Sequence, residues 1–345
     1  MPIRRPFLPL FLLPLVAAPL AGQGNRYTVT GRDVAIYNLA GTARIEPGTG
    51  PAVVVEVTRG GDDGSKLEVQ TGTISGRETL RIIYPSDRIV YPPLGRHSQS
   101  EIRVREDGTF DGHGGREVRI SGDGSGLEAF ADLRILVPAG QRIAVNLAAG
   151  GVTASNVNGQ LSIDASSSTV ETSGTKGSLS IDVGSGDVKV TGAEGELNVD
   201  TGSGNVTLSD LRGGEVGIDT GSGDVTATTL GARSLKVDTG SGNVTLSGVS
   251  TEDADIETGS GNIRLDVDGA LRSFHGETGS GDVTIRAPAS LSAALDIETS
   301  SGEIESDFEV AVTRREEDHL VGRIGAGTGR ISVDTGSGSV RLLRK

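Results

Sequence analysis

A short segment recurs along the chain at a nearly constant interval, and this repeat restricts the possible folds more than any other feature. Its clearest copy is VDTGSGNVTL at residues 199–208. The first acidic residues of successive copies are Asp164, Asp182, Asp200, Asp219, Asp238, Glu257, Glu277, Glu298 and Asp334. The last interval, from Glu298 to Asp334, is nearly twice the others, and we interpret it as two periods with one degraded copy. Such a period is typical of solenoids, whose repeats stack because none can bury its apolar face alone.

Within each copy, apolar and polar residues alternate on both sides of the Gly-Ser-Gly segment, and a period of two predicts β-strands. We expect Gly202 and Gly204 to supply the positive φ angles of a tight turn. Asp200 and its counterparts are expected to accept hydrogen bonds from turn amides. With no Trp, 4 Tyr and 6 Phe, the core must be built mainly from aliphatic side chains in thin layers. The sequence therefore predicts an all-β protein, a β-solenoid (single-stranded β-helix) with coils of about 19 residues.

The chain divides into three predicted parts. Residues 1–22 have the pattern of a signal peptide, with Arg4-Arg5, an apolar run over residues 7–20 and a small-residue end. Residues 23–140 are expected to form β-rich coils or a cap, with a polar loop over 86–126. Residues 141–345 are expected to form the solenoid repeats, with a hairpin insertion over 308–330. The basic residues at the end of the chain are expected to protect an exposed edge strand.

The predicted signal peptide implies export to the periplasm, the cell surface or the extracellular space, by the general secretory or the twin-arginine route. No second apolar run is long enough to predict a transmembrane segment in the mature chain. The net charge of −14 argues against a nucleic-acid partner, because phosphate binding needs a basic surface.

The repeat copies from Asp182 to Val340, with AGTARI at residues 40–45 and GTGRI at residues 327–331, resemble a bacterial family of secreted β-strand-repeat proteins named as adhesins. That family is a domain of unknown function. The resemblance covers roughly residues 30–345. It implies a β-solenoid outside the cytoplasm and supplies no catalytic residues.

The sequence contains few residues or motifs that are typical of catalytic or metal sites. The absence of cysteine excludes thiol nucleophiles, disulfides and cysteine-ligated metals. The chain lacks the common catalytic-serine, phosphate-loop and metal-helix motifs. Its four histidines, which we interpret as surface residues, are His97, His113, His275 and His319. We therefore predict no catalytic residues, no cofactor and no enzyme activity. The alternative is a carbohydrate-active β-helix, a polysaccharide lyase or hydrolase, since such enzymes share the fold.

If the coils stack in register, one acidic residue per coil forms an outward column in which neighbouring charges repel by about 0.9 kcal/mol in water. We predict weak binding of Ca²⁺ along this surface ladder, formed by Asp182, Asp200, Asp219, Asp238, Glu257 and Glu277. The alternative is that turn hydrogen bonds and salt screening suffice. A second column with oxygens suited to calcium comprises Asp187, Asn205, Asp224, Asn243, Asn262 and Asp282.

The function predicted from these features is that of an exported, non-enzymatic β-solenoid. It would present a repetitive polar and acidic surface for adhesion or for envelope-associated binding. The partner would be an envelope component, a glycan or a protein.

Overall fold

The computed structural model of the chain describes residues 25–110, 114–269 and 271–345. The predicted signal peptide, residues 1–22, and His113 lie outside these ranges. Two short 3-10 segments, Gly64–Lys66 and Pro92–Leu94, are the only helical elements in the described residues, and every other regular element is a β-strand. The prediction of an all-β protein is confirmed. Across the same ranges, no helix is long and apolar enough to cross a membrane.

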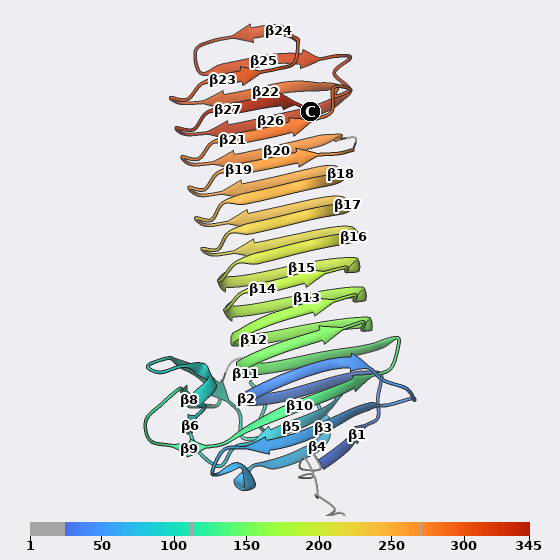
Figure 1. Ribbon diagram of the computed structural model, residues 1–345, viewed down its shortest axis with the longest axis vertical. Coiled ribbons are helices and arrows are strands. Elements are labelled where there is room, and N and C mark those ends of the chain that lie inside the picture. Colours follow the sequence, from blue (N-terminus) through green and yellow to red (C-terminus); the bar gives the residue numbers. More distant parts are fainter. Residues whose placement is uncertain (1–24, 111–113, 270) are drawn as a thin grey trace, which may run out of the picture.

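Parallel strands lie one above another along the long axis of the molecule (Figure 1). Leu161 pairs with Leu179, and Val237 pairs with Ile256, so equivalent positions of successive repeat copies lie in register. The strands of this part are β11 (Gln141–Ser155), β12 (Asn158–Ser173), β13 (Lys176–Ser185), β14 (Val188–Thr191), β15 (Glu194–Ser203), β16 (Val206–Thr220), β17 (Val225–Thr239), β18 (Val244–Thr258), β19 (Ile263–Val267), β20 (Ser273–Thr278) and β21 (Val283–Ala287). We call this part of the chain the stack.

The core of the stack consists of the inward residues of each strand, in the alternation that the sequence predicts. Val206 is 0% exposed and lies in register with Val225, which lies in register with Val244. Like side chains therefore pack on like side chains from layer to layer. Burial of each valine contributes about 1.5–3 kcal/mol relative to its exposure to water.

The turn glycines are required mainly by the close approach of neighbouring layers. A Cβ atom built on Gly242 would lie 1.8 Å from the carbonyl oxygen of Gly223 in the preceding layer. The expected positive φ occurs at Gly204, at +155°, but not at Gly202. The prediction for Gly202 is wrong because its constraint is contact with the layer below, where a Cβ would lie 2.6 Å from the carbonyl oxygen of Gly184.

Buried threonines, rather than the neighbouring acids, accept the hydrogen bonds of the later turns. The amide of Gly261 donates to Thr258 Oγ1 at 3.1 Å, and Thr258 Oγ1 donates to the carbonyl oxygen of Gly242 in the preceding layer at 2.9 Å. The same turn amide is bound in this way by Thr220, Thr239, Thr278, Thr299 and Thr335. The prediction that the acidic residues accept these bonds is therefore wrong for these later turns, because the acidic side chains point outward while the threonines point into the turn.

The strands at the C-terminal end do not stack in sequence order. They are β22 (Ala293–Thr299), β23 (Ile304–Ser306), β24 (Val310–Arg315), β25 (His319–Ile324), β26 (Gly329–Thr335) and β27 (Val340–Arg344). Strand β26 lies between β20 and β22, so Asp334 pairs with Glu277 on one side and with Glu298 on the other. Strand β27 lies likewise between β21 and β23 (Figure 1).

This arrangement corrects two predictions. The long interval between Glu298 and Asp334 does not contain a degraded copy of the repeat. The chain leaves one layer open, forms β22 and β23 and the antiparallel pair β24 and β25, and then returns to fill that layer. Nor is the basic end of the chain an exposed edge, because β27 has a partner on each side. Arg341 lies 3.4 Å from Asp282 and 3.2 Å from Glu305, so its charge is paired between layers.

The N-terminal part covers the other end of the stack. Its main strands are β1 (Asn25–Val29), β2 (Asp33–Pro47), β3 (Val53–Gly60), β4 (Glu68–Ile74), β5 (Arg77–Ile83) and β10 (Phe130–Val137). Strand β2 pairs in parallel with both β10 and β11. Behind it, the Tyr84 hydroxyl donates to Asn38 Oδ1 at 2.8 Å, and Asn38 Nδ2 donates to the Ala131 carbonyl oxygen at 2.7 Å. Burial raises the pKa of Tyr84 far above its usual value, so its hydroxyl stays protonated as a donor.

A separate four-stranded sheet occupies the polar segment 86–126 and the residues that follow it. It consists of β6 (Arg88–Val90), β7 (Gln99–Val104), β8 (Arg116–Ser121) and β9 (Leu127–Glu128), in the order β7-β8-β6-β9. Strands β7 and β8 pair in antiparallel register. The sheet lies beside the first layers of the stack (Figure 1), where it forms one wall of a cleft described below.

Candidate functional site

The six acids predicted as a ladder lie in one column on the outer face of the stack. Asp182 pairs with Asp200, Asp200 with Asp219 and Asp219 with Asp238. The series continues through Glu257 and Glu277. It is extended by Asp334 and Glu298, which the interleaved strands add at the C-terminal end. We call these eight residues the acidic column.

Like charges in the acidic column affect one another. Partial burial raises the pKa of Asp219, and the charges of Asp200 and Asp238 raise it further, while Lys236 lowers it. Within the described residues, the carboxylates of Asp200, Asp219 and Asp238 take part in no hydrogen bond. Their oxygens therefore face solvent and remain available to a cationic partner.

The second predicted column has a structural role. Asp187 Oδ1 accepts a hydrogen bond from the Asn205 amide at 2.9 Å, and Asp224 Oδ1 accepts one from the Asn243 amide at 2.8 Å. Asn243 Nδ2 also donates to Asp224 Oδ1, at 3.1 Å. Each side chain thus links one layer to the next, as in an Asn ladder. The repeat spacing identified the residues of this column, and the Oδ1 atoms of Asp187 and Asp224 link adjacent layers.

The described histidines lie in different settings. The side chain of His97 is 90% exposed, with its Nδ1 atom 3.7 Å from Asp123. His319 lies 2.9 Å from Asp296 through its Nε2 atom, on β25 and β22 respectively. His275 lies on the outer face of β20, and its imidazole lies close to the acidic side chains of Asp255, Glu257 and Glu277.

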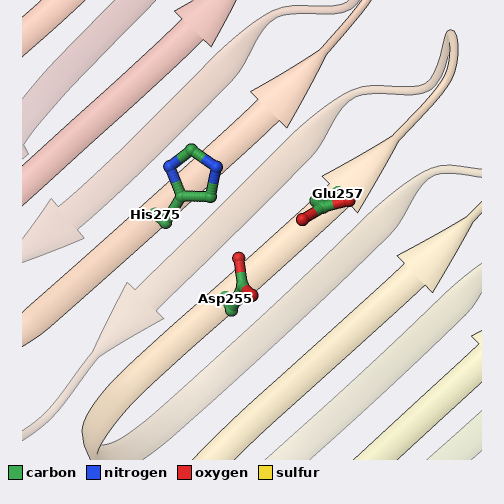
Figure 2. Close-up of side chains that lie close together, drawn as sticks. All are labelled: Asp255, Glu257 and His275. Atoms are coloured by element: carbon green, nitrogen blue, oxygen red, sulfur yellow. The ribbon is translucent and has the colours of Figure 1, made fainter.

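His275 forms a cluster with Asp255 and Glu257, two outward residues of β18 (Figure 2). Asp255 and His275 are partners in the parallel register. The possible ligand atoms of the three residues all lie within 4.8 Å of one another. We call these three residues the His275 cluster. The repeat pattern predicts Glu257 as a member of the acidic column, whereas His275 is interpreted from the sequence as an isolated surface residue. The signal that could have found the cluster is the spacing between positions 255 and 275, which equals that between the repeated acids Glu257 and Glu277.

The layer that contains His275 also departs from the repeat on its inner face. Phe274 is 0% exposed and stands where other layers have aliphatic residues. A Cβ atom at Gly276 would lie 2.7 Å from atoms of the Phe274 ring. Glycine at this position therefore makes room for the ring. The buried Phe274 anchors the strand that carries His275 outward.

A cleft of about 680 Å³ lies between the four-stranded sheet and the turns of the first layers of the stack. One wall carries the hydroxyl side chains of Thr42, Ser167 and Ser185, and the facing wall carries Pro93 and Leu94. None of the described residues that line the cleft is charged. It is therefore suited to a neutral ligand that combines hydroxyl groups with an apolar face.

Comparison with known proteins adds a family assignment. No curated protein matches the sequence significantly. Among solved structures, the chain is similar to a "putative cell adhesion protein" from Clostridium sporogenes, at 13% identity and a TM-score of 0.20, over 94% of this chain and 99% of that chain. Residues 132–343 match the Toastrack DUF4097 family, which confirms the resemblance inferred from the repeat copies. Because this match covers more than half of the chain, the protein belongs to the Toastrack DUF4097 family.

Proposed function

We propose that this protein is an exported, non-enzymatic β-solenoid whose acidic face binds a positively charged partner at the cell envelope or on another surface. The solenoid assignment is supported by parallel pairing between equivalent positions of successive repeat copies through β12 to β21. Export is supported by the pattern of residues 1–22.

The main support for this proposal is the acidic column. One carboxylate per layer makes a periodic array along the stack. On the other side of each Gly-Ser-Gly turn, one outward residue per layer forms a second register series. This series has Glu171 and Glu305 at its two ends and no acidic residue between them. The intervening residues are Lys189, Thr207, Thr226, Thr245, Arg264, Thr284 and Arg341. The acidic column therefore carries far more negative charge than the outward series on the strands after the turns. A periodic face favours a repetitive or extended partner, because many weak contacts add when they form together.

The repetition also favours binding over catalysis. A catalytic centre needs one exceptional group of unlike residues that converge on a reacting atom. The acidic column repeats a carboxylate in every layer. Neighbouring carboxylates repel each other, and their environments do not differ enough to make one a general acid and the next a general base.

Glycan binding in the cleft is a second candidate function. The hydroxyl groups of Thr42, Ser167 and Ser185 can bond to sugar hydroxyls, and Pro93 and Leu94 can contact an apolar sugar face. A glycoside hydrolase normally needs two carboxyl groups beside the scissile bond. The charge-free lining of the cleft therefore supports binding of a glycan and not its hydrolysis.

The proposed function can be tested by measuring adsorption of the purified chain to immobilised polylysine and to an uncharged polysaccharide. We expect saturable binding to polylysine that weakens as salt increases. Changing Asp200, Asp219 and Asp238 together to Asn should greatly weaken it. A matched control removes three charges elsewhere, by Glu316→Gln, Glu317→Gln and Asp318→Asn in the β24–β25 turn, and should bind almost as the unmodified chain. Equal losses in the two variants would show that only net charge matters.

Weak calcium binding along the acidic column stays a prediction. Millimolar Ca²⁺ should raise the melting temperature more than sodium chloride of equal ionic strength. The excess should shrink in the variant with Asn at positions 200, 219 and 238. Equal shifts of the melting temperature in the two salts would show that ionic screening alone explains the stabilisation.

A further inference from the structure

We propose that the His275 cluster is a binding site for a divalent transition-metal ion of the Zn²⁺ class. The donor set is one imidazole with two carboxylates, contributed by neighbouring strands (Figure 2). Imidazole nitrogen suits zinc and other first-row divalent ions, whereas calcium prefers six to eight oxygen ligands. The cluster therefore selects a different ion from the one predicted for the acidic column.

The distances within the cluster are compatible with a small ion. In a tetrahedral zinc site the ligand atoms lie about 2.0–2.2 Å from the metal, and so about 3.4 Å from one another. The ligand atoms of Asp255, Glu257 and His275 lie within 4.8 Å of one another. The His275 side chain is 41% exposed. Small rotations of these side chains can bring the atoms together without movement of the strands that carry them.

Asp255 gives an independent indication of a ligand. Its Oδ1 atom is inaccessible to solvent and has no hydrogen-bond partner in the described structure. Buried polar atoms in native proteins are nearly always satisfied. Coordination to an ion held by His275 would satisfy this oxygen, whereas no protein donor in the described structure does.

The charged groups around the cluster also favour a dication. On the β17 side, Lys236 is the register partner of Asp255, and Asp238 is the partner of Glu257. On the β26 side, Asp334 is the register partner of Glu277. Glu277 Oε2 lies 3.8 Å from His275 Nε2, where it can orient the imidazole or serve as a fourth ligand. Carboxylates thus outnumber the single lysine. An ion at this position would join β18 to β20, two consecutive layers of the stack.

The test is calorimetric titration of the purified full chain with zinc chloride after treatment with a chelator. We expect one ion per chain, and at least about tenfold weaker binding in His275→Gln. Asp255→Asn should weaken binding in the same direction. The matched control is His319→Gln, since His319 also contacts an aspartate but lies outside the cluster. This control should bind zinc as the unmodified chain does.

A spectroscopic measurement separates coordination from non-specific adsorption. Cobalt(II) bound to the unmodified chain should give visible absorption bands of a low-symmetry site, and these should be absent in His275→Gln. Melting temperatures measured in chelator verify that each variant is folded, since His275 is partly exposed. Absence of saturable zinc binding, or equal affinity in His275→Gln and the unmodified chain, would overturn the proposal.

Discussion

The middle of the stack and its C-terminal end are built from the same repeat but connected in different ways. From β12 to β18 each layer pairs with the layer that precedes it in the sequence. At the C-terminal end, Glu277 pairs with Asp334, and Ala293 pairs with Gly329. Both regions bury aliphatic side chains, and the threonine and glycine turn of the later layers of the middle recurs at the C-terminal end.

The difference shows that local repetition and chain order are separate properties. In the middle, each layer depends on neighbours that are adjacent in sequence, so its stability is close to a sum of layer and interface contributions. At the C-terminal end, β20 and β22 are joined only through a strand that comes after both of them.

Deletion of residues 329–345 should have the largest effect. It removes β26 and β27 with four buried apolar side chains, Ile331, Val333, Val340 and Leu342. At about 1.5–3 kcal/mol for each buried side chain, the loss exceeds that of a typical single substitution. Hydrogen exchange should show lost protection in β20–β23, while β12–β17 remain protected. Unchanged protection of β23, which pairs with β27, would contradict the interleaved order.

Substitution of Val206 by Asp tests the middle of the stack. Val206 is 0% exposed and packs between layers, so the new carboxylate has no partner in the core. We expect the free energy of unfolding to fall by more than about 3 kcal/mol, measured by denaturant titration. The matched control is Thr207→Asp, one residue away on the outer face, which should change the free energy of unfolding by far less. Similar losses in both variants would mean that the inward register is wrong.

Substitution of Gly242 by Ala tests the contact between layers. Its new methyl group would lie 1.8 Å from the Gly223 carbonyl oxygen, so the two layers must separate locally. We expect a loss of about 1–3 kcal/mol in thermal or chemical unfolding. In the control Gly214→Ala, no atom lies within 4 Å of the new Cβ, and the change should be within about 0.5 kcal/mol. Equal stability of the two variants would show that the turn glycines are not needed to avoid a steric clash between layers.

Substitution of Asp219 by Asn should have the smallest effect and the opposite sign. The raised pKa of Asp219 means that the folded chain binds its proton more tightly than the unfolded chain does. Its ionisation therefore lowers stability as pH rises from the usual aspartate pKa through the raised value. At neutral pH, Asp219→Asn should stabilise the protein by less than about 1 kcal/mol.

The pH dependence provides a second measurement for the same residue. The stabilisation by Asp219→Asn should vanish below the usual aspartate pKa, where both carboxyl and amide are neutral. Denaturant titrations at several pH values would detect this. A gain that persists at low pH would arise from something other than charge repulsion.

Much of the fold was predictable because alternation and period report which residues face the core and which residues share a register. The outward column from Asp182 to Glu277 follows directly from these two patterns. The order of the last layers was not predictable, because the long interval between Glu298 and Asp334 fits both a degraded copy and a strand that returns. Periodicity identifies equivalent positions, but it does not say which equivalent strand lies next in space.

The candidate sites were predictable to different degrees. The acidic column follows from one repeated position, whereas the His275 cluster combines a repeated acid with residues that occur in one layer only. Its detection requires the register between Asp255 and His275 in addition to the spacing. The threonine turn was missed because Thr258 and Glu257 are adjacent in the motif, and only the direction of each side chain distinguishes their roles.

The interior position of the C-terminal strands also determines the order in which the layers can form during synthesis. Domains form from the N-terminus during synthesis, and each layer from β12 to β18 emerges directly after the layer with which it pairs. Strand β22 is paired only later, because both of its partners, β25 and β26, follow it in the chain. A chain that stops early keeps an open layer, where a strand of another copy can add. The layer that contains β26 and β27 therefore closes only after both of these strands have been made.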